Sequence, residues 1–73
     1  MKQRVRMICI LKNGRVIKDS VKINKEELMH VNRLIAEIDN SLAKEPGDPK
    51  RMTNFTFAHT TVLFDEVAAV KIW

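Results

Sequence analysis

The stretch RVRMICILKNGRVIKDSVKI, residues 4–23, decides the fold because it places Asn13-Gly14 between two β-rich runs. Asn-Gly in that context is the strongest short-range signal for a β-hairpin, since both residues tolerate positive φ. We therefore predict a hairpin over residues 4–23 with a two-residue type I′ turn. In that register Lys12 faces Arg15, Leu11 faces Val16, Ile10 faces Ile17 and Ile8 faces Asp19.

The first run of this hairpin is apolar on both of its faces. Side chains alternate along a strand, so Ile8 and Ile10 share one face, and we expect the helix that follows to cover them. The opposite face is then covered within the chain or meets a second subunit. Tryptophan is a frequent interface anchor. The predicted subunit interface comprises Val5, Met7, Cys9, Leu11 and Trp73.

A helix is predicted over residues 25–43, which contain neither glycine nor proline. Asn24 is a suitable N-cap, and Glu27 stands three residues later, where a capping box places an acid. An apolar stripe at spacings of three and four residues comprises Leu28, Val31, Leu34, Ile35, Ile38 and Leu42. Residues 44–53 contain two prolines and a glycine and are predicted to form a loop.

The last part of the chain, residues 55–73, is predicted to form strands. Asp65-Glu66 is a plausible turn between them, and residues 65–69 also fit a short helical turn. The element order is β-β-α-β-β, or the same order with one extra short strand after the helix. We therefore predict one α+β domain over residues 1–73, an antiparallel sheet with one amphipathic helix packed on one face.

Size and charge limit the function classes. The chain has 73 residues and a formal net charge of +4, from 13 Lys and Arg against 9 Asp and Glu. That balance permits a nucleic acid or an acidic protein as partner. Cys9 is the only cysteine, which excludes an intrachain disulfide and favours a reducing, cytoplasmic location. The apolar run over residues 7–11 is too short for a membrane span or a signal peptide, so we expect no membrane association.

No residue pattern argues for catalysis or for a metal. Cys9 lies in the middle of an apolar strand, where a buried structural thiol is the ordinary state. His30 and His59 lack the closely spaced partner ligands that zinc sites show. We therefore predict that the protein is not an enzyme and needs no cofactor.

Asp19 is the one acid in the second run of the hairpin. In the predicted register it lies on the face of Ile8, where burial would raise its pKa. The alternatives are that it lies at the sheet margin or that it pairs with Arg6 or Lys18.

Two segments, ILKNGRVI at residues 10–17 and VLFDEVAAVKI at residues 62–72, lie on either side of the predicted helix. Together they resemble a group of small ββαββ proteins from phages and mobile elements. The resemblance implies a small accessory protein, often oligomeric, that binds a host protein or a small signalling ligand. It assigns no functional residue.

Two functions follow as expectations. The first is an oligomeric interaction protein that binds a protein or a small ligand at a subunit interface. The alternative is a nucleic-acid-binding protein, because basic residues beside an aromatic strand can hold phosphates and stack bases. It requires Phe55 and Phe57 to be exposed. The predicted nucleic-acid contacts are Arg4, Arg6, Arg15, Lys18, Lys50, Arg51, Phe55 and Phe57.

Overall fold

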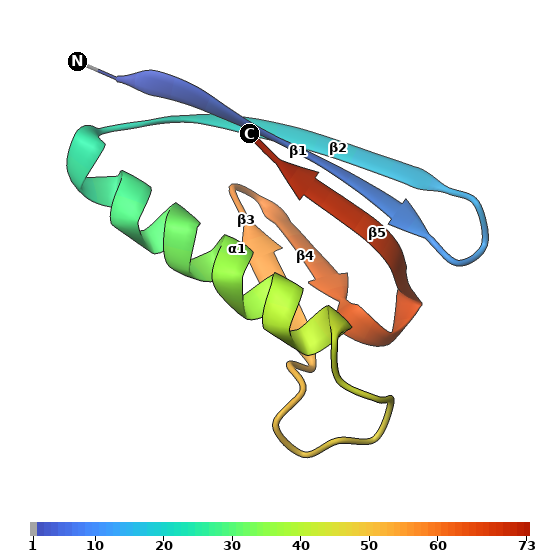
Figure 1. Ribbon diagram of the computed structural model, residues 1–73. Coiled ribbons are helices and arrows are strands. Elements are labelled where there is room, and N and C mark those ends of the chain that lie inside the picture. Colours follow the sequence, from blue (N-terminus) through green and yellow to red (C-terminus); the bar gives the residue numbers. More distant parts are fainter. Residues whose placement is uncertain (1) are drawn as a thin grey trace.

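The computed structural model describes residues 2–73 and has the α+β architecture that the sequence predicts (Figure 1). Its strands are β1 Gln3–Leu11, β2 Val16–Ile23, β3 Asn54–Phe57, β4 Thr60–Leu63 and β5 Val67–Ile72. Helix α1 spans Leu28–Leu42, and 3-10 turns occupy Lys25–Glu27 and Phe64–Glu66. Three strands therefore follow the helix, as in the version with one extra strand.

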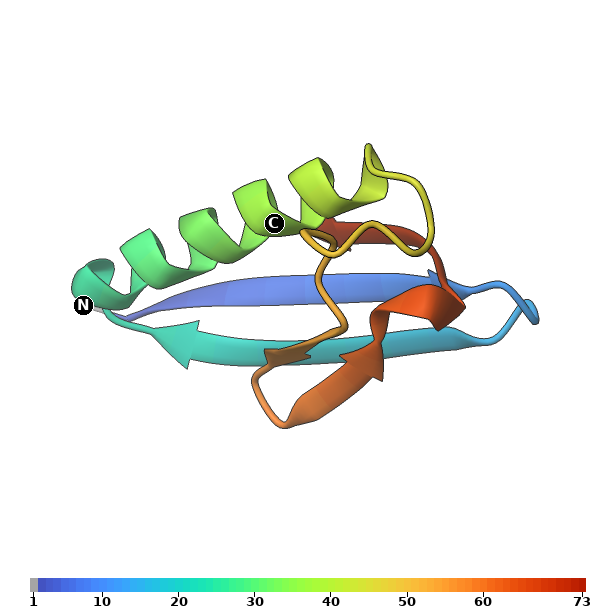
Figure 2. The ribbon, with the colours of Figure 1, turned by 90° about the horizontal axis from the view of Figure 1, so that it is seen from below.

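The strands form two antiparallel units. β1 lies in the centre of a three-stranded sheet in the order β2-β1-β5, and β3 pairs with β4 in a separate hairpin. Helix α1 and the β3-β4 hairpin lie against the same face of the three-stranded sheet, which we call the inner face (Figures 1 and 2). The fold thus has two layers, with the hydrophobic core between them.

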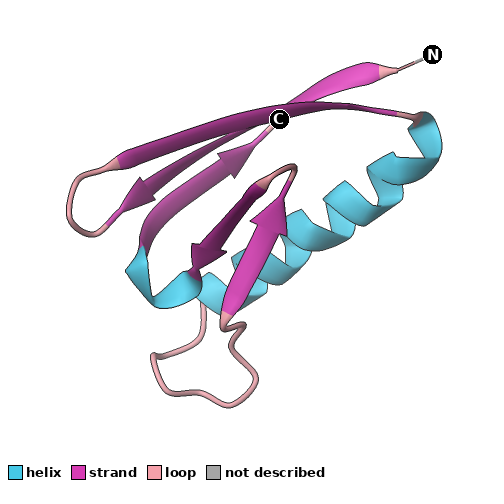
Figure 3. Cartoon of the chain, turned by 180° about the vertical axis from the view of Figure 1, so that it is seen from behind, coloured by secondary structure: helices cyan, strands magenta, loops and turns pink. Residues whose placement is uncertain are grey.

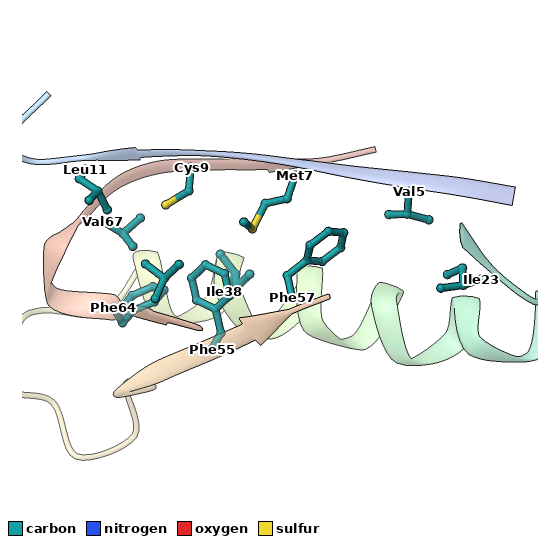
Figure 4. Packing of buried hydrophobic residues seen from close by; sticks show 11 residues of the cluster. Val5, Met7, Cys9, Leu11, Ile23, Ile38, Phe55, Phe57, Phe64 and Val67 are labelled. Carbon is teal, nitrogen blue, oxygen red and sulfur yellow. The ribbon is translucent and has the colours of Figure 1, made fainter. Parts of the chain in front are cut away.

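The core combines side chains from every strand and the helix. Figure 4 shows Met7 and Cys9 pointing from β1 toward Ile38 of α1 and toward Phe55 and Phe57 of β3. Burial of such apolar area is the main favourable contribution to folding. The buried set comprises Val5, Met7, Cys9, Leu11, Ile23, Ile38, Phe55, Phe57, Val62, Phe64 and Val67.

The β1-β2 hairpin forms where predicted, but its register differs by one residue. The Gly14 N–H donates to the Leu11 carbonyl at 2.9 Å, and the Leu11 N–H donates to the Arg15 carbonyl at 2.9 Å. Ile10 therefore pairs with Val16 across a three-residue loop, and the predicted two-residue turn is wrong. The loop is a tight turn closed by Gly14 at φ +88°, a conformation that glycine adopts without strain.

This shift exchanges the two faces of β2 relative to β1, because side chains alternate with a period of two. Cys9 pairs with Ile17, and Met7 pairs with Asp19, so all four lie on the inner face. The prediction that the helix covers Ile8 and Ile10 is wrong. The residues predicted to form a subunit interface on β1 are instead core residues of this chain, each at most 8% exposed: Val5, Met7, Cys9 and Leu11.

The predicted helix consists of the 3-10 turn followed by α1. At its start, the Asn24 N–H donates to Glu27 Oε1 at 3.4 Å, which is the reciprocal half of the predicted capping box. Ile38 is fully packed, whereas Leu42 at the end of the predicted stripe is 38% exposed. Ser41 is buried in its place, and its hydroxyl accepts the Met52 N–H at 3.1 Å. This bond ties the end of the helix to the segment that enters β3.

Candidate functional site

The second face of the three-stranded sheet, which we call the outer face, is the most distinctive surface of the molecule. No helix or strand of residues 2–73 covers it (Figures 1 and 3). Alternation along the paired strands determines which side chains it carries. They are Arg4, Arg6, Ile8 and Ile10 from β1, Val16, Lys18, Ser20 and Lys22 from β2, and Ala69, Lys71 and Trp73 from β5 and the residue after it.

One row of side chains crosses the outer face through Arg6. The Arg6 N–H donates to the Trp73 carbonyl at 2.8 Å, and the Trp73 N–H donates back to the Arg6 carbonyl at 2.9 Å. Ser20 pairs with Arg6 on the other side. Arg4 Nη1 donates to Ser20 Oγ at 2.9 Å, so this guanidinium is held against the row.

The next row of the outer face is centred on Ile8. Lys18 of β2 and Lys71 of β5 both pair with Ile8. The apolar side chain of Ile8 therefore lies between two lysine side chains. Lys71 Nζ lies 5.5 Å from the centroid of the Trp73 ring, within cation–π range. The two rows together combine an aromatic ring, an apolar floor and positive charge.

The outer face is strongly cationic. Within residues 2–73, this face carries no acidic residue. Its five basic residues are Arg4, Arg6, Lys18, Lys22 and Lys71. All five are exposed. The predicted register had divided the β1 and β2 cations between opposite faces, and the observed register brings them together. Lys71 was absent from the predicted contacts, although its position between Val70 and Ile72 in an alternating strand already indicated an outward side chain.

The aromatic strand of the nucleic-acid prediction does not lie on this surface. Phe55 and Phe57 are each 3% exposed and point into the core (Figure 4). The Phe55 and Phe64 rings meet edge to face with centroids 6.4 Å apart. The prediction that Phe55 and Phe57 stack bases is therefore wrong, because their face of β3 packs against the inner face of the sheet.

Arg51 is also a structural residue rather than a free cation. Its guanidinium lies 4.8 Å from the centroid of the Phe64 ring, and its Nη1 contacts Asp65 Oδ1 at 2.8 Å. Its Nε donates to the Ser41 carbonyl at 3.3 Å, and its side chain is only 9% exposed. These contacts use two of its three nitrogens and hold the side chain in place. Arg51 therefore packs against Phe64 away from the outer face, and its contact with nucleic acid stays a prediction.

Two further predicted contacts are exposed but lie away from the outer face. Lys50 belongs to the loop between α1 and β3. Arg15 pairs with Leu11, so by alternation it lies on the inner side of the sheet at its turn end. Of the predicted contacts, the structure thus brings together Arg4, Arg6 and Lys18, and it adds Lys22 and Lys71.

Asp19 connects the two layers. Its Oδ2 accepts the Thr60 hydroxyl at 2.7 Å and the His59 N–H at 3.2 Å, and its Oδ1 accepts the Ser20 N–H at 2.8 Å. The Thr60 hydrogen bond, followed by the Ser20 N–H, lowers the pKa of this carboxyl below its usual value. The prediction of a raised pKa is wrong, and so is the pairing with a neighbouring cation. The carboxylate instead joins β2 to the β3-β4 turn.

This arrangement predicts a pH-dependent stability. Because the pKa of Asp19 is lower in the folded protein, its carboxylate stabilises the fold above the unfolded-state pKa of about 3.9. That contribution is lost as the pH falls through the folded-state pKa. We expect the urea midpoint to fall as the pH is lowered below about 4, and Asp19→Asn to reduce this fall. An unchanged pH profile in Asp19→Asn would show that ionisation of Asp19 does not account for the loss of stability in acid.

Cys9 is the one thiol among the residues considered for chemistry. Cys9 is fully buried, and burial raises the pKa of its thiol, which disfavours the reactive thiolate. Within residues 2–73, no group of three or more His, Cys, Asp or Glu side chains is close enough to hold a metal ion. None of the helices in this range is sufficiently long and apolar to cross a membrane.

A hollow of about 580 Å³ lies on the outer face between β2 and the end of β5, lined by Arg4, Arg6, Ile8, Lys18, Ser20 and Trp73 together with Met7 and Asp19. Its size is in the range of small-molecule and cofactor sites. Its lining carries three cations, one carboxylate and one half-exposed aromatic ring. Comparison of the chain with models of protein families, with curated proteins and with solved structures found no match.

Proposed function

We propose that this protein binds nucleic acid through the outer face of its three-stranded sheet. The observation that carries the proposal is the charge of this face, which has five exposed cations and no acid among residues 2–73. Contacts between such side chains and phosphates release counterions, and this release supplies most of the affinity of non-specific binding. The net charge of +4 is modest, but it is concentrated on one uncovered surface.

The same charge argues against self-association through this face. A two-fold dimer uses the same patch on both subunits, so its cations would meet their own copies. Like charges brought together at an interface oppose binding. A polyanion meets the same five side chains with complementary charge. Nucleic acid therefore fits the outer face better than a second copy of the chain does.

Binding of a protein partner is the second candidate, favoured by the uncharged row at the turn end of the outer face. Ile10 and Val16 pair with each other and are 41% and 53% exposed, and Ala69 pairs with Ile10 on the other side. Exposed apolar side chains in one row are typical of contact surfaces. Light scattering at micromolar concentration tests self-association at this row. A dimer that Ile10→Lys dissociates would support it, and a monomer would contradict it.

The nucleic-acid proposal is tested by fluorescence anisotropy with a labelled single strand and the matching duplex. If all five cations contact phosphates, the slope of log K against log salt is about −3 to −4 for a single strand. Affinity then falls about 100-fold between roughly 50 and 200 mM salt. Absence of binding to either probe at low salt would contradict the proposal.

Charge reversal locates the contact surface. The double variant Arg6→Glu with Lys18→Glu should weaken binding at least about tenfold and reduce the salt slope by about one to two. The matched control, Lys25→Glu with Lys50→Glu, removes the same charge at exposed sites outside the outer face. The control should lose much less affinity. Equal losses in the two variants would show that net charge, and not the outer face, is responsible.

A further inference from the structure

The hollow beside Trp73 gives the outer face a feature that phosphate binding alone does not require. Trp73 is 48% exposed, and its backbone is fixed by two hydrogen bonds to Arg6. The indole is therefore a half-exposed aromatic surface at the residue after β5, with Lys71 Nζ 5.5 Å from the centroid of its ring. Ile8 supplies an apolar floor beside it, and Lys18 lines the opposite side.

The cations around this hollow remain available to a ligand. Within residues 2–73, the side chains of Arg6 and Lys18 make no hydrogen bond and no ion pair. Arg4, by contrast, is oriented by its bond to Ser20. A ligand in the hollow thus meets an aromatic plane on one side and free phosphate-binding groups on the other.

Resting on the proposed function, we infer that the hollow holds one unpaired nucleotide of a single strand. The base lies against the Trp73 ring, and its phosphates contact Arg6 and Lys18. Every base has a π-face, so this contact tolerates any sequence. In a duplex the bases are stacked and paired inside the helix, and only the phosphates reach the sheet. The protein should therefore prefer single strands to duplexes.

The chain provides its own probe for this inference. Trp73 is the only tryptophan, and there is no tyrosine, so intrinsic fluorescence reports on this one residue. An oligothymidylate of about 12 nucleotides has a suitable length for a single small domain. Titration with this strand should quench Trp73 emission as binding saturates. Inorganic polyphosphate, which carries charge but no bases, should bind without comparable quenching.

Substitution of Trp73 separates stacking from charge. Trp73→Ala should lower affinity for oligothymidylate about tenfold. Its affinity for polyphosphate should stay within about twofold, since all five cations remain. Trp73→Phe keeps an aromatic ring and should fall between the wild type and Trp73→Ala. Circular dichroism shows whether each variant is folded. If Trp73→Ala does not fold, Trp73→Phe still provides the test.

Three outcomes would overturn the inference. If oligothymidylate and polyphosphate both bind but neither Trp73 substitution changes affinity, the nucleotide site is wrong while the cationic interface stands. If neither polyanion binds at low salt, the inference and the proposed function both fail. If emission of the free protein shifts with protein concentration and light scattering shows a dimer, a second copy covers Trp73 instead.

Discussion

Replacing Met7 with lysine is expected to unfold the protein. Met7 is 1% exposed and lies between the sheet and the second layer. Loss of such a buried apolar side chain lowers the free energy of unfolding by about 2–5 kcal/mol. An unpaired buried ammonium lowers it by roughly several kcal/mol more. A domain of this size has a total stability of only roughly 5 kcal/mol. Far-UV circular dichroism of Met7→Lys in buffer should therefore show a largely unfolded chain.

The matched substitution lies three residues away on the same strand. Ile10 is 41% exposed on the outer face, so Ile10→Lys should change the free energy of unfolding by less than about 1 kcal/mol. Urea titrations of both variants measure the contrast. If Ile10→Lys unfolds the protein and Met7→Lys does not, the faces of β1 are exchanged and the cationic outer face does not exist. The pair thus tests which face of β1 is buried, on which the proposed function depends.

Phe64→Ala is the second substitution with a large expected effect. Phe64 is fully buried, and its ring is packed edge to face against Phe55 and covered by the Arg51 guanidinium at 4.8 Å. Removing a core phenylalanine costs about 3–5 kcal/mol through lost burial and the cavity left behind. The ring also supports Arg51, whose contacts hold the end of α1 and Asp65 together. Loss of most of the stability is expected in urea titrations.

The adjacent residue provides the control for this core position. Leu63 is 54% exposed, and Leu63→Ala should cost less than about 1 kcal/mol. Phe64→Leu fills part of the cavity and should recover a substantial part of the stability. A Phe64→Ala variant as stable as Leu63→Ala would contradict the packing of the 3-10 turn Phe64–Glu66 beneath the sheet.

The hairpin register links stability to function in this protein. In the predicted register, Arg4 and Arg6 face away from Lys18 and Lys22, so neither face is strongly cationic. With the observed three-residue loop, all four side chains lie together and Lys71 joins them. A one-residue difference in a turn therefore decides whether the sheet presents a binding surface for polyanions. In the observed register, the apolar side chains of β1 that were predicted to form a subunit interface lie on the same face as Ile17 and are part of the core.

Local sequence determined much of this fold. The Asn13-Gly14 signal placed the first hairpin, the 3.6-residue periodicity from Leu28 to Ile38 placed α1, and the prolines after it placed the loop. These features depend on backbone preferences and on periodic burial, both of which are expressed within a few neighbouring residues.

Only the tertiary structure decided which face of β1 is buried, because that strand is apolar on both faces and local pattern cannot choose between them. The choice came from the three-residue loop closed by Gly14 and from the pairing of β5 with β1. It also came from the position of the β3-β4 hairpin, which buries Phe55 and Phe57 beside α1. Apart from the loop, these are contacts between residues distant in the chain, and the pairing of β5 with β1 placed Trp73 beside Arg6 on the outer face.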